Sequence, residues 1–145
     1  MQPLSTALIR RPFHWGIVIV SDVKSGGDIP EVHPNALVTA NDHGVIVLVR
    51  HAQDIPSFDG NFDWAESEVM VRLLPASAAT RTDRREVFRG RLSVPSGRIS
   101  MGDADDEVVH SAHSGLNEVV ITVARDVDES DRSPDAIQID LLPVE

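Results

Sequence analysis

Apolar and polar residues alternate along much of this chain, and this period-two pattern limits the fold more than any other feature of the sequence. Residues 68–73 read EVMVRL, and residues 119–123 (VVITV) continue the pattern in a more apolar form. Successive side chains of a strand point to opposite faces, so this alternation predicts half-buried strands. Apolar residues almost nowhere recur at the three- or four-residue spacing of a helix. The chain is therefore predicted to be all-β.

About eight segments show the strand pattern, and turn-forming or charged segments separate them. Between two of them, residues 41–44 (NDHG) predict a hairpin turn, since Asn, Asp and Gly favour tight turns. The predicted strands are residues 15–20, 36–39, 44–50, 68–73, 88–94, 98–101, 118–125 and 137–141, and residues 102–107 are predicted to be a loop. Short strands at this spacing favour a two-sheet antiparallel β-sandwich with little helix. A chain of 145 residues is expected to form one domain over residues 1–145.

The net charge of −10 lies in the last third of the chain, where residues 101–145 hold twelve acidic residues and two arginines. Such a surface favours a basic protein or a cation as partner and repels the phosphates of nucleic acid. The alternative is that the acidic loops only keep the domain in solution. The predicted partner-binding residues are Asp103, Asp105, Asp106, Glu107, Asp126, Asp128 and Asp131.

Two large aromatic residues, Phe62 and Trp64, lie in an otherwise polar segment. They have two interpretations. They either close one end of the sandwich, or they form an apolar anchor for a partner, a role in which tryptophan is enriched. We include Trp64 in the predicted binding face.

Metal binding is the main alternative to a protein partner. The acidic runs at residues 103–107 and 126–131 place oxygen ligands at alternate positions, but they lack the Gly and Glu that an EF-hand requires. A looser calcium site in these loops remains open. His110 and His113, with Glu107, would share one face of a helix and could bind zinc, whereas a strand end or loop, which Gly115 favours, would separate them. We therefore expect no cofactor, with calcium or zinc as the alternative.

No sequence motif predicts catalysis or membrane insertion. The chain has no cysteine, no GxSxG motif and no glycine-rich phosphate loop before a helix. No apolar run reaches the roughly 18–20 residues that span a bilayer. Arg89 and Arg91 alternate with apolar residues, so we expect them on a solvated sheet face, paired with acidic residues of the last third. We expect a soluble, cytoplasmic protein that is not an enzyme.

The order of features in residues 86–145 adds a resemblance. A strand segment, VFRGRLSVPSG, leads directly into RISMGD; an acidic stretch, GLNEVVITVAR and a closing IQIDLLP follow. This order resembles a group of small bacterial β-sandwich proteins that includes competence protein J, an inhibitor of a secreted nuclease. The resemblance implies a sandwich fold and a binding function, and it carries no functional residue over to this chain.

The sequence therefore predicts a non-catalytic acidic binding protein. Its function would be that of an inhibitor, immunity or accessory protein for a basic partner such as a nuclease. The alternative is a β-sandwich that binds a metal ion or small ligand through loop carboxylates and histidines. Self-association through an edge strand also stays open, because an open sandwich leaves unpaired strand edges.

Overall fold

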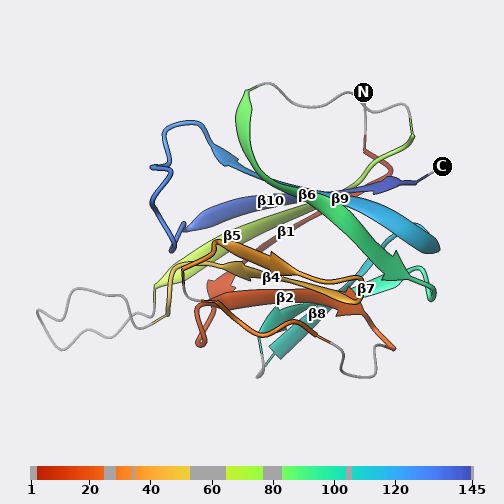
Figure 1. Ribbon diagram of the computed structural model, residues 1–145, viewed down its shortest axis with the longest axis horizontal. Coiled ribbons are helices and arrows are strands. Elements are labelled where there is room, and N and C mark those ends of the chain that lie inside the picture. The colour runs from red at the N-terminus through yellow and green to blue at the C-terminus, as the bar shows by residue number, and fades with distance from the viewer. Residues whose placement is uncertain are drawn as a thin grey trace, which may run out of the picture.

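The computed structural model describes residues 3–24, 29–33, 35–52, 65–76, 83–103 and 106–144, which form two β-sheets packed face to face (Figure 1). The strands of these ranges are β1 (Ser5–Pro12), β2 (Ile17–Asp22), β3 (Val38–Ala40), β4 (Gly44–Leu48), β5 (Glu66–Leu73), β6 (Arg84–Val94), β7 (Arg98–Asp103), β8 (Asp106–Ser111), β9 (Gly115–Ala124) and β10 (Ala136–Pro143). The all-β, two-sheet prediction is confirmed. In the part of the chain that the structure describes, no helix is long and apolar enough to cross a membrane.

Within the described residues, each sheet has five strands. Sheet A has the order β1-β5-β10-β9-β6, and sheet B has the order β3-β4-β2-β7-β8. All described pairings are antiparallel except that of β10 with β5, which runs parallel from Ala136 opposite Glu68 to Leu141 opposite Leu73. The predicted antiparallel arrangement of the sandwich therefore has one exception among the described pairings, at this pair. The hairpin with β9 fixes the direction of β10, which then lies beside β5.

Eight of the ten strands match predicted segments, and β1 and β8 are additional. In β1 (STALIRRP), Leu8 points outward and two adjacent arginines follow, which obscures the alternation. In β8 (DEVVHS), the buried residue of the alternation is His110 rather than an aliphatic residue. The predicted loop at residues 102–107 is wrong, because β7 continues to Asp103 and β8 begins at Asp106.

Trp15 lies outside the strand in which the sequence pattern placed it. Strand β2 begins at Ile17, and Trp15 is 59% exposed in the preceding turn. The turn is closed by a hydrogen bond from the Gly16 N–H to the Phe13 carbonyl at 3.0 Å, and Gly16 has a φ of 66°. Because this φ disfavours any residue with a Cβ, the turn depends on glycine.

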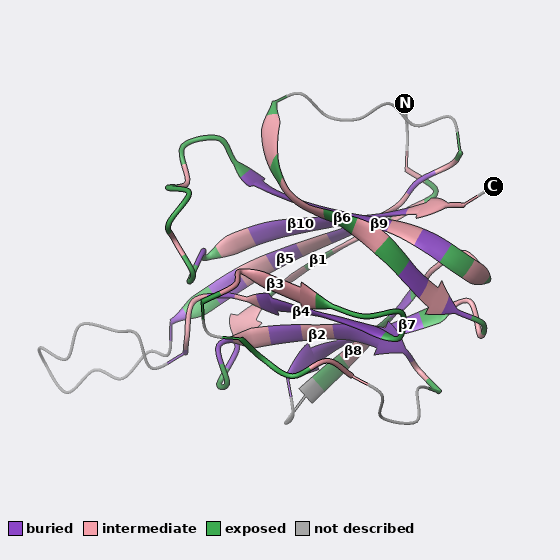
Figure 2. Ribbon diagram, in the orientation of Figure 1, coloured by how far each residue is buried: buried purple, intermediate pink, exposed green. Residues whose placement is uncertain are grey.

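The core lies between the two sheets, where the inward faces of the strands meet (Figure 2). Aliphatic side chains provide most of it, and each contributes about 1.5–3 kcal/mol on burial. From sheet B come Val18, Val20, Val45, Val47, Ile99 and Met101, and from sheet A come Val69, Val71, Leu92, Val119, Ile121, Ile139 and Leu141. The local alternation of the sequence thus selects which side chains enter the core.

Candidate functional site

The loop between β9 and β10, residues 125–135, carries three of the predicted partner-binding residues. Asp126 and Asp128 are exposed, and Asp131 is half-buried. The N–H and hydroxyl groups of Ser130 donate to Asp128 Oδ1 at 2.8 and 2.6 Å, and the Ser133 N–H donates to Asp131 Oδ1 at 2.8 Å. The Ser130 hydroxyl and then its N–H hold the pKa of Asp128 below its usual 3.8. The carboxylate of Asp128 is therefore charged at neutral pH.

Two arginines attach this acidic loop to the body of the sandwich. Arg85 of β6 donates from Nη2 to the Val127 carbonyl at 2.8 Å. Arg132 donates from Nε to the Asn35 carbonyl at 3.1 Å, and from Nη1 to the Glu129 carbonyl at 2.9 Å. Asn35 belongs to the connection that leads into β3 of sheet B. The loop is thus held against both sheets.

The other acidic segment lies elsewhere. The β7–β8 hairpin is at the edge of sheet B and the β9–β10 loop is on sheet A, on the lower and upper sides of the sandwich in Figure 1. Asp103 is only 2% exposed, and its Oδ1 lies 4.0 Å from Nη2 of Arg11 on β1. The structure therefore corrects the assignment of Asp103 to an exposed binding face. The sequence does not reveal this burial, because it depends on β1.

The remaining predicted acidic and aromatic residues are placed only in part. Glu107 is exposed on β8. Asp106 begins the same strand, and its side chain is outside the description. Asp105 and Trp64 lie outside the described residues. Their roles stay predictions.

His110 and His113 have separate protein partners. His110, at 8% exposure, donates from Nδ1 to the Ser111 carbonyl at 2.7 Å, and its Nε2 lies 3.2 Å from Ser5 Oγ. His113 donates from Nε2 to the Leu74 carbonyl at 2.7 Å. Among the described residues, no three histidine, aspartate or glutamate side chains gather in a way that could hold a metal ion. No observation in this part of the chain favours the metal-binding alternative.

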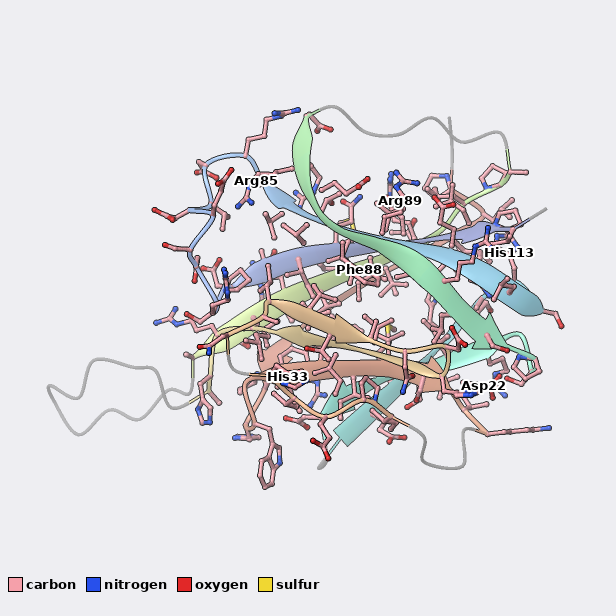
Figure 3. The ribbon with its side chains drawn as sticks, viewed as in Figure 1. Asp22, His33, Arg85, Phe88, Arg89 and His113 are labelled. Carbon is pink, nitrogen blue, oxygen red and sulfur yellow. The ribbon has the colours of Figure 1, made fainter. Side chains whose placement is uncertain are left out.

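The predicted solvated face of β6 is present. Arg89 contacts Glu86 at 2.7 Å and also forms an ion pair with Glu118 of β9, and Arg91 is exposed opposite Glu118. Figure 3 shows Arg89 on the outer side of sheet A. The expected pairing with an acidic residue of the last third therefore holds for Arg89.

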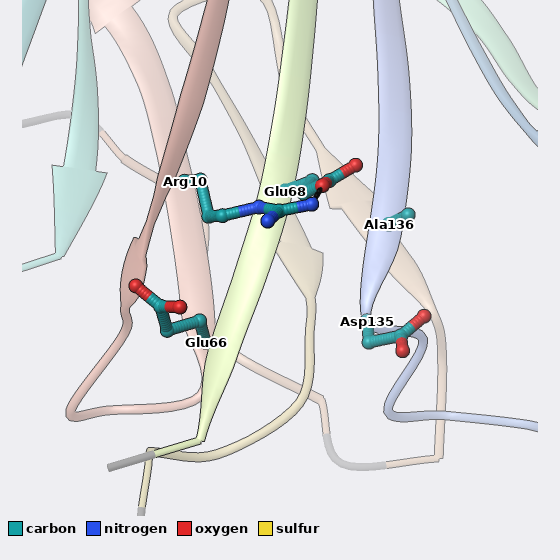
Figure 4. Close-up of a pocket in the computed structure, with 5 residues that line it drawn as sticks. All are labelled: Arg10, Glu66, Glu68, Asp135 and Ala136. Carbon is teal, nitrogen blue, oxygen red and sulfur yellow. Dashed lines mark ion pairs between the residues drawn. The ribbon is translucent and has the colours of Figure 1, made fainter. Parts of the chain in front are cut away.

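A hollow on the outer face of sheet A extends the acidic surface. It has a volume of about 330 Å³. Its lining residues are Arg10, Glu66, Glu68, Asp135 and Ala136. Figure 4 shows Arg10 crossing β5 to Glu68, with which it forms an ion pair. Asp135 ends the acidic loop and Glu66 begins β5, so the hollow brings together side chains from three segments that are far apart in the sequence.

A second hollow, which we name the β3–β6 groove, lies where the edges of the two sheets face each other. It has a volume of about 410 Å³. Its lining residues are Leu37, Val38, Arg85, Glu86, Val87, Phe88, Glu129 and Arg132. Figure 3 shows Phe88 between the layers and Arg85 beside the β9–β10 loop. Sequence reasoning missed this groove because its walls come from β3, β6 and the acidic loop.

The fold is that of the competence protein J type of β-sandwich, which confirms the resemblance noted in the sequence. One similar solved structure is ComJ, an inhibitor of the DNA-degrading activity of NucA, from Bacillus subtilis. It has a TM-score of 0.62 and 11% sequence identity, over 99% of this chain and 98% of that chain. Another is the crocagin biosynthetic gene J product, with a TM-score of 0.59 and 16% identity over 97% and 98% of the two chains. No protein family and no curated protein sequence gives a significant match.

Proposed function

We propose that this chain is a non-catalytic acidic binding protein, an inhibitor or accessory protein that acts in the cytoplasm on a basic protein partner such as a nuclease. The proposal rests on one observation, which is that hydrogen bonds order the β9–β10 loop while Asp126 and Asp128 on it stay exposed to solvent. Such preordering reduces the conformational entropy lost on binding. The likeness to ComJ over nearly the whole chain supports the same class of function.

Electrostatic attraction accounts for partner choice in this proposal. Exposed carboxylates raise the rate of encounter with a cationic surface, and salt weakens the attraction over a Debye length of about 8–10 Å. Glu66 and Asp135 enlarge the same surface. A basic partner should therefore be retained at low salt and released at high salt.

Affinity capture from the cells of origin at about 50 and about 300 mM salt, followed by mass spectrometry, tests the proposal. The test variant carries Asp126→Asn, Asp128→Asn and Asp131→Asn, and it should lose the salt-sensitive partner. The matched control removes three negative charges elsewhere. Its substitutions are Glu31→Gln, Asp42→Asn and, at a half-buried position like that of Asp131, Glu118→Gln.

The purified partner is then titrated against each variant, and its own activity is measured. The control should bind and inhibit the partner better than the loop variant does. Capture that is independent of salt, or equal loss of binding in both triple variants, would show that the β9–β10 loop does not select the partner.

A further inference from the structure

The β3–β6 groove exists because two facing edge strands differ in length. β6 has 11 residues and β3 has only 3. Near the C-terminal end of β6, the Ser93 N–H donates to the Asp42 carbonyl of the β3–β4 turn at 3.0 Å, which joins the two sheets. Figure 1 shows the N-terminal end of β6 curving away from sheet B. The groove opens along this end, beside Val87 and Phe88.

The floor of the groove is an accessible part of the core. Val38, Val87 and Phe88 are half-buried and pack against the buried core cluster. On the opposite side of the sandwich, contacts between β1 and sheet B bridge the two edges, as the 3.2 Å contact of Ser5 with His110 shows. Another apolar group that covers these partly exposed side chains would remove apolar surface from water, which is energetically favourable.

The walls of the groove provide both charge and main-chain groups. Glu129 lines the groove and is exposed, and Asp126 and Asp128 lie in the same loop. Arg85 and Arg132 donate to main-chain carbonyls of that loop. The described part of β6 pairs with β9 on one edge, and its other edge contacts the β3–β4 turn at Ser93, so the part of that edge beside Val87 and Phe88 faces the groove and can receive an extended segment.

We propose that the β3–β6 groove receives an extended segment of the basic partner protein. An apolar side chain of that segment packs on Val38 and Phe88, and a neighbouring lysine or arginine faces Glu129 at the rim formed by the acidic loop. This inference rests on the proposed function and names the segment that the partner presents. The register shift between Glu86 and Phe88 interrupts regular pairing along β6, which favours a short segment.

A peptide titration followed by amide NMR spectra tests the groove directly. One probe is a seven-residue peptide that alternates lysine with valine or leucine, and the second has glutamate in place of lysine. The basic peptide should shift the amide signals of Val38, Val87 and Phe88, and the acidic peptide should not. The absence of these shifts at millimolar peptide, or equal shifts with both peptides, overturns the proposal.

Blocking the groove gives a second measurement. Because the chain has no cysteine, Glu129→Cys can be labelled selectively with a bulky maleimide. Glu31→Cys, also at an exposed glutamate, is the matched control. The labelled groove variant should bind the basic peptide about tenfold or more weakly, the effect of losing the burial of one aliphatic side chain. Equal affinity of the two labelled proteins overturns the proposal.

The same proteins separate this inference from the proposed function. A basic partner retained equally by both labelled variants overturns the groove and leaves the proposed function standing. If the wild type captures no protein in a salt-sensitive way, the proposed function is overturned. The peptide titration then still decides whether the groove binds a basic segment. A wild-type dimer in sedimentation that only the label at residue 129 dissociates would make a second copy the occupant, and this too overturns the proposal.

Discussion

The pair formed by Arg72 and Asp140 links the two parallel strands of sheet A and gives the sharpest test of the fold. Arg72 of β5 lies opposite Asp140 of β10. Its Nε donates to Oδ1 at 2.8 Å and its Nη2 donates to Oδ2 at 2.9 Å. Asp140 is 6% exposed, and the Gln138 amide lies 3.2 and 3.3 Å from the same two oxygens.

Arg72→Met removes both guanidinium hydrogen bonds and leaves the buried carboxylate with the Gln138 amide. Breaking a buried ion pair in this way costs about 3–5 kcal/mol. Replacing both partners, with Arg72→Met and Asp140→Leu together, removes the uncompensated group and should recover most of this loss. Both the recovered loss of Arg72→Met and the separate loss in Asp140→Leu enter the coupling free energy, so we expect it to be about 3 kcal/mol, the upper end of the usual range.

Urea denaturation of the wild type, both single variants and the double variant measures the four free energies of unfolding. With a slope of about 2 kcal/mol per molar urea, the Arg72→Met midpoint should fall by about 1.5–2.5 M. A loss below about 1 kcal/mol in Arg72→Met, or a double variant as unstable as the single variants, would refute the reasoning. Either result would mean that the pair is solvated rather than buried between β5 and β10.

Three further substitutions test other parts of the fold. Leu92→Ala should lower the free energy of unfolding by about 2–5 kcal/mol in urea, because Leu92 is 0% exposed in the core. Gly16→Ala should cost about 1–2 kcal/mol, seen as a lower Tm, because the residue has a φ of 66°. Burial of Asp22 opposes its charge, but N–H groups of Ser96 and Lys24 outweigh this effect and lower its pKa below 3.8. The resulting stabilisation is present above the pKa that Asp22 has in the unfolded chain, and it is lost as pH falls through the lower pKa of the folded protein. Below about pH 4, the free energy of unfolding should therefore fall more in the wild type than in Asp22→Asn.

An exposed leucine serves as the control for Leu92→Ala, and each of the other two substitutions has an outcome that would contradict it. Leu116→Ala, at a side chain that is 41% exposed, should change the free energy of unfolding by less than about 0.5 kcal/mol. If Leu92→Ala costs no more than this, Leu92 does not lie in the core. Identical acid profiles for Asp22→Asn and the wild type would contradict the lowered pKa. An unchanged Tm in Gly16→Ala would mean that the turn tolerates a Cβ.

The candidate site was predictable only in part. The acidic run that contains Asp126 and Asp128 is visible in the sequence, and the structure places both on an exposed loop. An equally acidic run contains Asp103, which is buried beside Arg11. Composition gives the number of charges, whereas accessibility depends on which distant strand lies next to each of them.

The sequence alone determined the strand character of eight segments and the division of their side chains between core and solvent. These properties are local, because a strand alternates its faces every residue whatever it pairs with. The tertiary structure decided the order of strands in each sheet, the parallel pairing of β10 with β5, and the recruitment of β1 and β8 as edges. It also decided the β3–β6 groove, since the length mismatch of two edge strands matters only after the sheets have packed. Pairing and packing depend on contacts between residues far apart in the chain, and the alternation of neighbouring residues does not specify these contacts.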